Sequence, residues 1–335
     1  MPNDPRIYVA VRPDEFARLF DDDATAALKR LGAVEFAAGE GKMPLPDGLA
    51  DSFDVLITSW STAPFDPEQV QGDRLRLAVH AAGTIRGLFP KTVLERGLRI
   101  AQGGSAAMAL PVAEMALTLT LALLRNLHTH DRKLQATRDW VAGGTGVLGR
   151  SIQAQRIGIV GLSRTGRHYL DMLKGLGVRQ IAVYDPYLDA AEADRLGVTS
   201  MGLSDLFAWS DVAAIHAPVT PETRGMIDAD VLVKMRDGGI VVNTARSAVT
   251  DESALLAEVR SGRLQAGLDV FDTEPLPGDS AFYGLPNVII TPHVAGGTVE
   301  ARYAQGATVV SEIQRFLSGQ AMEHEVTAEI YDRLS

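Results

Sequence analysis

The chain has 335 residues, of which 46% are hydrophobic, and its formal net charge is −10. This length and hydrophobic content suffice for two domains, each with a core of its own. A negative charge without a long run of Lys or Arg argues against binding to nucleic acid or to an anionic membrane. The sequence contains no cysteine, which excludes disulfides, thiolate zinc sites and thiol catalysis.

The N-terminal stretch MPNDPRIYVAV lacks the basic start, apolar middle and small-residue cleavage site of a signal peptide, so we expect a cytoplasmic protein. The apolar stretch at 106–124 is interrupted by Glu114, Thr118 and Thr120, and Pro111 suits the first turn of a helix. We therefore expect a buried or interface helix there and no membrane span. Such a helix suggests a homodimer, although burial inside one chain explains it nearly as well.

Short apolar runs alternate with helical patterns from the N-terminus onward. Strand-like runs occur at 7–11, 53–59, 75–83 and 98–102, and a helical pattern covers 14–31. This alternation predicts a parallel α/β sheet.

The run VHAAGTIRG places small residues after one of these strands, at the end of a parallel sheet where ligands bind. Exposed N–H groups of Ala82, Gly83 and Thr84 could hold a substrate carboxylate at this point. Alternatively, the segment is a plain turn in which Gly83 supplies a positive φ.

Residues 156–185 read as strand, tight turn, helix and strand. Gly161 and Gly166 occupy the first and third glycine positions of a dinucleotide fingerprint, and the helix start offers free N–H groups to a pyrophosphate. Asp185 ends the second strand, where a carboxylate accepts hydrogen bonds from an adenosine ribose and repels a 2′-phosphate. NAD is therefore favoured over NADP, although a glycine-bearing turn without a nucleotide fits this stretch alone.

Ser163 replaces the middle glycine of this fingerprint. Its Cβ stands where the backbone would approach the pyrophosphate most closely, and its hydroxyl could donate a hydrogen bond to a phosphate.

Four further strand-like runs follow at 211–217, 239–245, 265–270 and 287–292, and an amphipathic helix spans 299–317. Together with the two strands of 156–185 they give the six strands of a doubly wound dinucleotide domain.

We place this domain at 109–298 and a second one at 1–108 plus 299–335, with the active cleft between them. The predicted fold class is α/β, with two doubly wound parallel-sheet domains, a Rossmann domain being inserted in a flavodoxin-like substrate domain.

Arg246, Glu274 and His293 each follow a predicted strand of the same sheet, whose carboxyl ends share one edge with the glycine turn. An arginine there can hold an anionic group bidentately, and a histidine can exchange a proton with a carbonyl. A carboxylate beside that imidazole favours its charged form and fixes its tautomer. Each residue alone has a plainer reading, as a surface ion pair, a turn or a loop cap.

The remaining histidines show no metal-ligand spacing with acidic residues, so we expect no metal site. We read two of them, His128 and His130, as solvated residues at a helix end.

The segments HAPVTPETRGMID and NTARSAVTDESALLAEVRSGRLQAGLDVFDTEPLPGDSAFYGLPNVIITPHVAGGT resemble motifs of the D-isomer-specific 2-hydroxyacid dehydrogenases. The stretches PVAE, GIVGLSRTG and VYDP fit the same family, and the likeness covers about residues 75–300. It implies a reversible, NAD-linked reduction of a 2-keto acid to the D-2-hydroxy acid. Ser163 and Ser247 depart from it, because the family usually has glycine at both positions.

The resemblance implies that Arg246 anchors the substrate carboxylate, that His293 is the acid/base and that Glu274 is its partner. Asp185 would contact the ribose and Asp269 the nicotinamide carboxamide, and His216 would be structural or line the cofactor site. The full set of implied cofactor contacts is Gly161, Ser163, Arg164, Thr165, Gly166, Asp185, Ala217, Pro218, Thr223, Thr244, Ala245, Arg246, Asp269, His293 and Gly296.

The substrate side chain would meet residues of the first domain and the helix around Met108, or Trp140 of a neighbouring subunit. Our candidates for this contact are Trp60, Ser61, Thr84, Ile85, Arg86, Met108 and Trp140. The competing hypothesis is a non-catalytic NAD(H)-sensing interaction protein on the same scaffold, as are the transcriptional corepressors that resemble this family.

Overall fold

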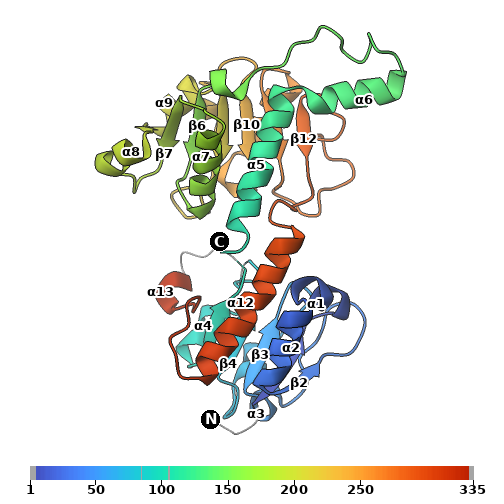
Figure 1. The fold of residues 1–335 in the computed structure, drawn as a ribbon, viewed down its shortest axis with the longest axis vertical. Helices are drawn as coiled ribbons and strands as arrows, with labels where there is room; N and C mark the ends of the chain where they lie inside the picture. The colour runs from blue at the N-terminus through green and yellow to red at the C-terminus, as the bar shows by residue number, and fades with distance from the viewer. Residues whose placement is uncertain (1–4, 84, 105, 332–335) are drawn as a thin grey trace. The chain divides into compact units, whose positions relative to one another are not determined.

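A computed structural model describes residues 5–83, 85–104 and 106–331. The chain forms two units, which are drawn in Figure 1. Unit 1 comprises Met1–Met108 and Gly297–Ser335, and unit 2 comprises Ala109–Gly296. The sequence of unit 2 is therefore inserted into that of unit 1.

A five-stranded sheet with the order β2-β1-β3-β4-β5 forms the centre of unit 1, and all of its strand pairs are parallel. The order is that of a flavodoxin-like fold. In this fold β2 is added on one side of β1 and the later strands on the other, so the direction of strand addition reverses between β1 and β3. The strands are β1 (Arg6–Ala10), β2 (Ala33–Phe36), β3 (Val55–Thr58), β4 (Leu77–His80) and β5 (Arg99–Gln102).

Helices cover both faces of this sheet because successive strand residues point to opposite sides. Ile7 and Val9 pack with α1, α2 and α12, whereas Tyr8 and Ala10 pack on the side of α3 and α4. The helical elements of unit 1 are α1 (Pro13–Leu19), α2 (Asp22–Leu31), α3 (Leu49–Ser52), η1 (Pro67–Val70), α4 (Lys91–Glu95), α12 (Val299–Leu317) and α13 (Ala328–Tyr331).

The structure differs from the sequence prediction at two places in unit 1. The helical pattern at 14–31 is divided into α1 and α2, because Asp21 begins a new helix by accepting a hydrogen bond from the N–H of Ala24. The strand β2 was not predicted. It is a short edge strand whose residues are mostly exposed, so it has no apolar run.

Unit 2 is built on a seven-stranded parallel sheet with the order β12-β11-β10-β9-β6-β7-β8. This is the doubly wound order of a Rossmann fold, and the direction of strand addition reverses between β6 and β9. The six predicted strands are present, and β8 was missed because it has only two exposed residues. The strands are β6 (Ile157–Val160), β7 (Ile181–Tyr184), β8 (Thr199–Ser200), β9 (Val212–Ile215), β10 (Ile240–Asn243), β11 (Gln265–Leu268) and β12 (Val288–Ile290).

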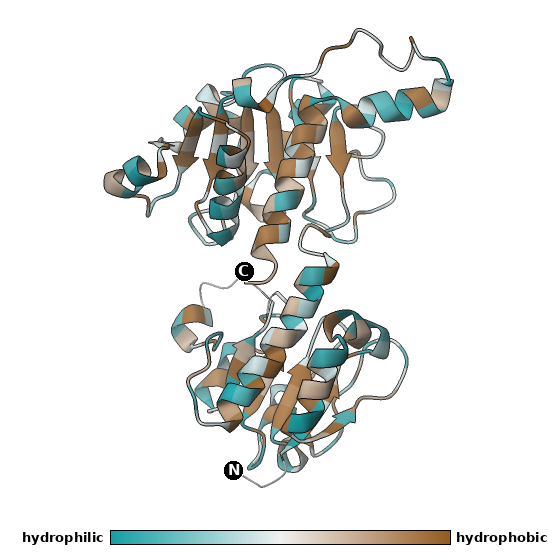
Figure 2. Cartoon of the chain, viewed as in Figure 1, coloured by the Kyte–Doolittle hydropathy of each residue, from teal (hydrophilic) through white to brown (hydrophobic). Residues whose placement is uncertain are grey.

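Two hydrophobic clusters hold helices against the two faces of this sheet. One contains α5 and α7, and the other contains α9, α10 and α11. Figure 2 shows the central strands of both units as mainly hydrophobic, as expected for strands buried on both faces. The helical elements of unit 2 are α5 (Ala109–Leu124), α6 (Leu127–Thr137), η2 (Ile152–Ala154), α7 (Arg164–Gly175), α8 (Ala190–Leu196), α9 (Leu203–Trp209), α10 (Ala229–Leu232), η3 (Ser247–Val249) and α11 (Glu252–Arg260).

The helix α6 and the segment 138–149 extend beyond the sheet of unit 2 (Figure 1). We call them the arm. No residue of α6 is buried, and the arm exposes large apolar side chains such as Trp140 and Leu148. The two histidines of α6 are not simply solvated as predicted: His128 Nε2 bonds to the carbonyl of Pro286, and His130 Nδ1 bonds to the carbonyl of Gly143.

No helix within the described ranges is by itself long and apolar enough to cross a membrane. The helices α5 and α6 meet the length and composition criteria only as a pair, and they are bent by 60° at their junction. The apolar residues of α5, including Ala113, Leu119 and Leu123, are buried in the core of unit 2.

Candidate active site and cofactor site

The turn after β6 requires glycine at two positions. Gly161 has a φ of +90°, and a Cβ there would lie 2.7 Å from the backbone of Ala217. A Cβ on Gly166 would lie 2.3 Å from the carbonyl oxygen of Gly161. Gly161 therefore allows the tight turn beside the segment after β9, and Gly166 allows α7 to approach the turn closely, as the fingerprint predicts.

Ser163 does not need to be glycine, because its φ of −63° is open to any residue. Its hydroxyl donates to the carbonyl of His216 and accepts from the N–H of Gly166, so that it caps α7. The hydroxyl proton is used by this carbonyl in the arrangement described, and its donation to a phosphate stays a prediction. Ser247, the second departure, also has no positive φ.

The N-terminus of α7 offers donors that nothing else in the described structure uses. The N–H groups of Arg164 and Thr165 make no hydrogen bond to another described residue. They lie at the positive end of a 12-residue helix, and such an end favours an anionic group. This is the arrangement that a pyrophosphate requires.

Asp185 is held rigidly where the ribose of a dinucleotide would lie. Its Oδ2 accepts from the N–H of Leu162 at 2.6 Å, and its Oδ1 accepts from the N–H of Tyr187 at 2.8 Å. Each carboxylate oxygen retains a further lone pair for a hydroxyl group. The carboxylate is thus fixed in orientation and still able to accept from a ligand.

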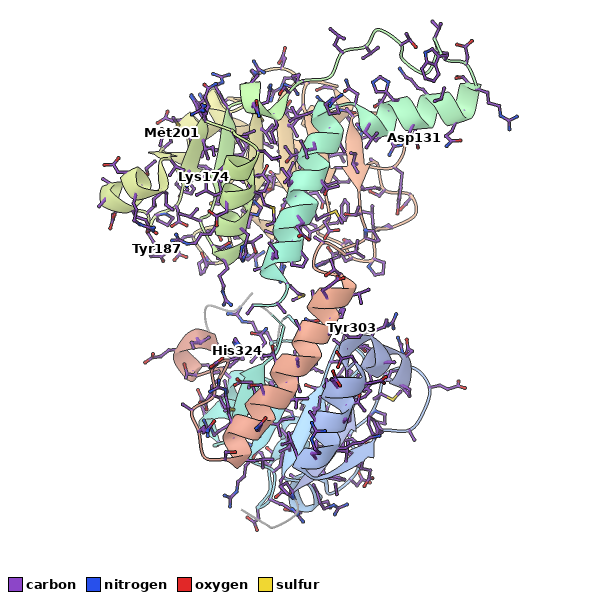
Figure 3. All side chains as sticks on the ribbon, viewed as in Figure 1. Asp131, Lys174, Tyr187, Met201, Tyr303 and His324 are labelled. Atoms are coloured by element: carbon purple, nitrogen blue, oxygen red, sulfur yellow. The ribbon has the colours of Figure 1, made fainter. Side chains whose placement is uncertain are left out.

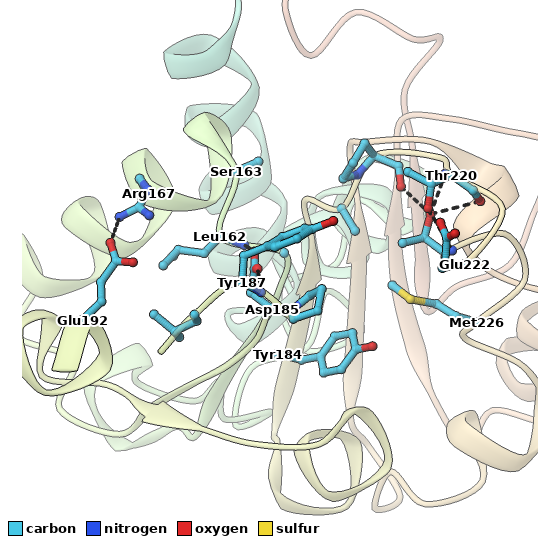
Figure 4. A pocket seen from close by; sticks show the side chains of 16 residues that line it. Leu162, Ser163, Arg167, Tyr184, Asp185, Tyr187, Glu192, Thr220, Glu222 and Met226 are labelled. Carbon is cyan, nitrogen blue, oxygen red and sulfur yellow. Dashed lines mark hydrogen bonds and ion pairs between the residues drawn. The ribbon is translucent and has the colours of Figure 1, made fainter. Parts of the chain in front are cut away.

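A cavity of about 520 Å³ lies beside this carboxylate and the glycine turn (Figure 4). Six of the predicted cofactor contacts line it, namely Gly161, Ser163, Asp185, Ala217, Pro218 and Thr223. It also has lining residues that the sequence did not reveal: Leu162, Arg167, Tyr184, Pro186, Tyr187, Leu188, Glu192, Thr220, Glu222 and Met226. Those next to Asp185 could have been inferred from adjacency, whereas Glu222 and Met226 depend on the path of the loop after β9.

Two buried polar groups farther along the sheet edge lack partners among the described residues. Thr244, predicted to contact the cofactor, has its hydroxyl oxygen buried without a hydrogen bond. Both ring nitrogens of His216 are also buried without partners, and burial lowers the pKa of His216 to about 3. The ring contacts Tyr169 at a centroid distance of 5.0 Å, consistent with a neutral, structural imidazole.

His293 and Glu274 form the contact that the sequence predicted. His293 Nδ1 lies 2.6 Å from Glu274 Oε2, and the other oxygen of Glu274 accepts from the N–H of Phe271. His293 has a φ of +52°, which is uncommon for a residue with a side chain. Because Nδ1 is engaged by the carboxylate, Nε2 is the ring nitrogen left to face a ligand.

Arg246 follows β10 and belongs to the same edge. The side chain of Asn243 fixes its backbone, donating to the carbonyl of Arg246 and accepting from the N–H of Ala245, each at 3.0 Å. Burial lowers the pKa of the Arg246 guanidinium, and the nearby carboxylate of Glu274 offsets part of this effect. An arginine side chain nevertheless stays charged at neutral pH, because its ordinary pKa is so high. Its Nη1 donates to the carbonyl of Ala245, and the remaining donors can serve an anion.

Asp269 directly follows β11. Its side chain is 0% exposed, and its carboxylate accepts from the N–H groups of Val294 and Ala295 and from the hydroxyl of Thr291. These bonds hold the loop that carries His293. Asp269 is therefore a positioning residue in this structure, and its contact with a nicotinamide carboxamide stays a prediction. Gly296 ends the same loop.

The predicted substrate contacts in unit 1 follow β4. Ala82 is buried and Gly83 is partly exposed, and their N–H groups make no hydrogen bond to another described residue. Gly83 has no positive φ, so the plain-turn alternative is not supported. Thr84 lies outside the described residues.

Several candidates for contact with the substrate side chain have other roles. Ile85 is fully buried in the core, Ser61 is buried with its hydroxyl accepting from the N–H of Arg12, and Arg86 donates to the carbonyl of Tyr331. Trp60 remains 41% exposed and Trp140 is 75% exposed.

One grouping of possible metal ligands occurs within the described residues. Ligand atoms of Glu312, Glu323 and His324 lie within 4.8 Å of one another. The carboxylate of Glu312 already accepts from the N–H groups of Glu323 and His324, and Glu323 pairs with Arg315. Sequence spacing did not predict this grouping, because residues 312 and 323 lie in different segments.

The parallel sheet, the two glycines, the free helix N-terminus and the oriented Asp185 carboxylate define unit 2 as an NAD-binding domain of an oxidoreductase. Comparison with known proteins agrees: residues 117–295 match the model of the D-isomer specific 2-hydroxyacid dehydrogenase, NAD binding domain. The chain belongs to the D-isomer-specific 2-hydroxyacid dehydrogenase family.

Similar proteins include D-3-phosphoglycerate dehydrogenases. That of Mycobacterium leprae is 33% identical over 309 residues, covering 91% of this chain and 56% of that protein. That of Mycobacterium tuberculosis is 38% identical over 297 residues, covering 88% of this chain and 55% of that protein. The chain thus spans little more than half the length of these relatives. The structure of a D-2-hydroxyisocaproate dehydrogenase superposes with a TM-score of 0.82 at 26% identity, covering 96% of this chain and 99% of that one.

Proposed function

We propose that this protein catalyses the reversible, NADH-dependent reduction of a 2-keto acid to the D-2-hydroxy acid. The single observation that carries the proposal is the His293–Glu274 pair at 2.6 Å, on the sheet edge that also bears Arg246 and the cofactor cavity. An acid/base, a guanidinium and a nucleotide site on one edge are what this reduction requires.

The chain's own residues bind and protonate the substrate. The guanidinium of Arg246 holds the keto acid carboxylate and aligns the neighbouring carbonyl. The free N–H groups of Ala82 and Gly83 in unit 1, together with Thr84, are proposed to bind the same carboxylate. The hydride comes from the nicotinamide ring of bound NADH.

His293 Nε2 gives its proton to the keto oxygen in reduction and takes it back in oxidation. Glu274 orients the ring through Nδ1 and stabilises the imidazolium. Because the N–H of Phe271 fixes the other oxygen of Glu274, the carboxylate cannot rotate away from the imidazole without losing a hydrogen bond.

We also propose that the protein is a cytoplasmic homodimer. The exposed apolar side chains of the arm, among them Leu127, Trp140 and Leu148, support a second copy of this chain as the partner. Light scattering on the eluted protein measures its mass directly, and a monomer at all concentrations contradicts the proposal.

The test is a panel of 2-keto acids with NADH and NADPH, followed by nucleotide absorbance. The parent enzyme should reduce at least one keto acid with NADH, and His293→Gln should lower kcat by ~10²–10⁴-fold. His324→Gln, a histidine of unit 1 outside the proposed machinery, serves as the matched control. Turnover of His293→Gln within about tenfold of the parent would refute the acid/base assignment. Tight NADH binding without turnover of any keto acid would favour the sensing function instead.

A further inference from the structure

An ion pair lines the cofactor cavity of unit 2 on the side of α7 and α8. Arg167 follows Gly166 on α7, and Glu192 lies in the first turn of α8, the helix that follows β7. Both side chains line the cavity that contains the Asp185 carboxylate. Figure 4 shows this pair on one side of Asp185, and Figure 3 labels Tyr187, which lies between Asp185 and α8 in the chain. The pair therefore belongs to the part of the cavity that would receive the adenosine ribose.

Glu192 holds the guanidinium of Arg167 in a defined contact. Nη1 of Arg167 donates to Glu192 Oε1 at 2.8 Å, and the same oxygen accepts from Nη2 of Arg195 at 3.3 Å. The backbone N–H of Glu192 donates at 2.8 Å to Oδ1 of Asp189, the residue that caps α8. The side chain of Glu192 is 27% exposed and that of Arg167 is 44% exposed. The carboxylate is thus the less exposed and better anchored partner, and it fixes the position of the guanidinium.

The lining of this cavity is acidic on balance. Among its described residues, Asp185, Glu192 and Glu222 carry carboxylates and Arg167 carries the one basic side chain. A 2′-phosphate adds about two negative charges to the adenosine ribose, so it is repelled here unless a cation is free to bind it. Arg167 is the cation that could do so, and its charge is offset by Glu192.

Arginine has the chemistry that a 2′-phosphate requires. Its planar guanidinium offers paired donors to phosphate oxygens, and an arginine near the ribose accommodates the phosphate in NADP-binding sites of this topology. Arg167 lines the cavity beside the residue that would contact the ribose, yet its Nη1 and its countercharge belong to Glu192. Asp185 would repel the phosphate directly, whereas Glu192 acts on it through a second side chain.

We propose that Glu192 is a positioning residue that determines nucleotide specificity through Arg167. By pairing with the guanidinium it withholds from a 2′-phosphate the cation that would otherwise bind it. Discrimination against NADP therefore has two sources, the carboxylate of Asp185 and the Arg167–Glu192 pair. The inference goes beyond the proposed function, because it requires nucleotide binding by unit 2 and no particular substrate.

Two nucleotides that differ only in the 2′-phosphate test the inference by calorimetry on the full-length protein. AMP and adenosine 2′,5′-bisphosphate share the base, the ribose and the 5′-phosphate. Glu192→Gln keeps the shape of the side chain and removes its charge. It should raise the affinity for the bisphosphate relative to that for AMP by about fivefold or more, while the affinity for AMP stays within about twofold of the parent. A merely structural role of Glu192 would change both affinities together.

A second substitution shows whether the effect passes through Arg167. Arg167→Met in the Glu192→Gln background should return the ratio of the two affinities to within about twofold of the parent value, because the released cation is gone. Arg195→Met is the matched control. It removes the other guanidinium that contacts Glu192 Oε1, which does not line the cavity, and it should leave the ratio within about twofold of the parent.

An unchanged ratio in Glu192→Gln, or a gain that survives in the double variant, would overturn the inference. The measurement is separate from the proposed function, since it follows nucleotide binding and not turnover. A parent that binds AMP but reduces no keto acid contradicts the proposed function alone, and the ratio still decides the role of Glu192. A parent that binds neither nucleotide contradicts the assignment of the cavity and this inference with it.

Discussion

Replacing Asp269 by asparagine is a sensitive perturbation, because it changes one atom of a fully buried side chain. The carboxylate accepts from two backbone N–H groups, those of Val294 at 2.9 Å and Ala295 at 2.8 Å, and from the hydroxyl of Thr291. Asparagine can retain the acceptor that serves Val294 and Thr291. Its amide nitrogen then faces the N–H of Ala295, so that two donors meet.

The expected loss of stability follows from these contacts. One hydrogen bond to a charged acceptor is lost, at ~1.5–3 kcal/mol, and a buried donor without a partner adds ~1–3 kcal/mol. Asp269→Asn should therefore lower the free energy of unfolding by about 3 kcal/mol. Asp269→Ala leaves all three donors unpaired and should lower it by up to ~5 kcal/mol. The same loop carries His293, so kcat should fall more than NADH affinity.

Urea unfolding followed by circular dichroism measures the loss, with Asp279→Asn as the control at an exposed aspartate of the same region. The control should stay within ~0.5 kcal/mol of the parent. A similarly small effect of Asp269→Asn would refute the conclusion that a buried carboxylate holds this loop by accepting three hydrogen bonds.

Three further perturbations have defined outcomes. Gly166→Ala places a Cβ 2.3 Å from the carbonyl oxygen of Gly161. It should therefore destabilise unit 2 by ~1–3 kcal/mol and weaken NADH binding by about tenfold or more, as measured by unfolding and by NADH fluorescence titration. Gly175→Ala is the control, because the space at its Cβ is open, and it should change neither quantity. Burial lowers the pKa of His216 to about 3. Below a pH of about 6.5 the imidazole is therefore protonated in the unfolded state and neutral in the native state. The free energy of unfolding should fall as the pH falls through this range. Between pH 6.5 and 4.5 the parent should lose ~2 kcal/mol more than His216→Gln in urea unfolding, and parallel pH curves would contradict the burial of a neutral imidazole. Asp185→Ser removes the charge that repels a 2′-phosphate, so the ratio of kcat/KM for NADH to that for NADPH should fall at least about tenfold. An unchanged ratio would contradict the assignment of Asp185 to the ribose.

The sequence sufficed for those parts of the site that depend on periodicity and on strand ends. The glycines 161 and 166 and the acid at 185 have roles set by local backbone geometry, so their spacing alone placed them. His293 and Glu274 are 19 residues apart, yet both follow strands of one parallel sheet, and that sheet order brings them together.

Features that depend on side-chain contacts across the fold could not be predicted. The hydroxyl of Ser163 is used by the carbonyl of His216, which is 53 residues away. The burial of Asp269 depends on how the loop after β12 turns back on the strand end. The stacking of Arg302 on Trp60 joins segments separated by the whole of unit 2. Edge strands such as β2 and β8 were missed because they bury little and so lack an apolar pattern.

The insertion of unit 2 within unit 1 constrains the order of events during synthesis. The sheet face that receives α1 and α2 is completed by Val309, Ile313 and Phe316 of α12, which a ribosome produces only after the last residue of unit 2. The nascent nucleotide-binding domain can mature first, while the N-terminal strands wait with an apolar surface uncovered. A released fragment that ends at residue 298 should therefore be one in which unit 2 resists protease and the first hundred residues do not.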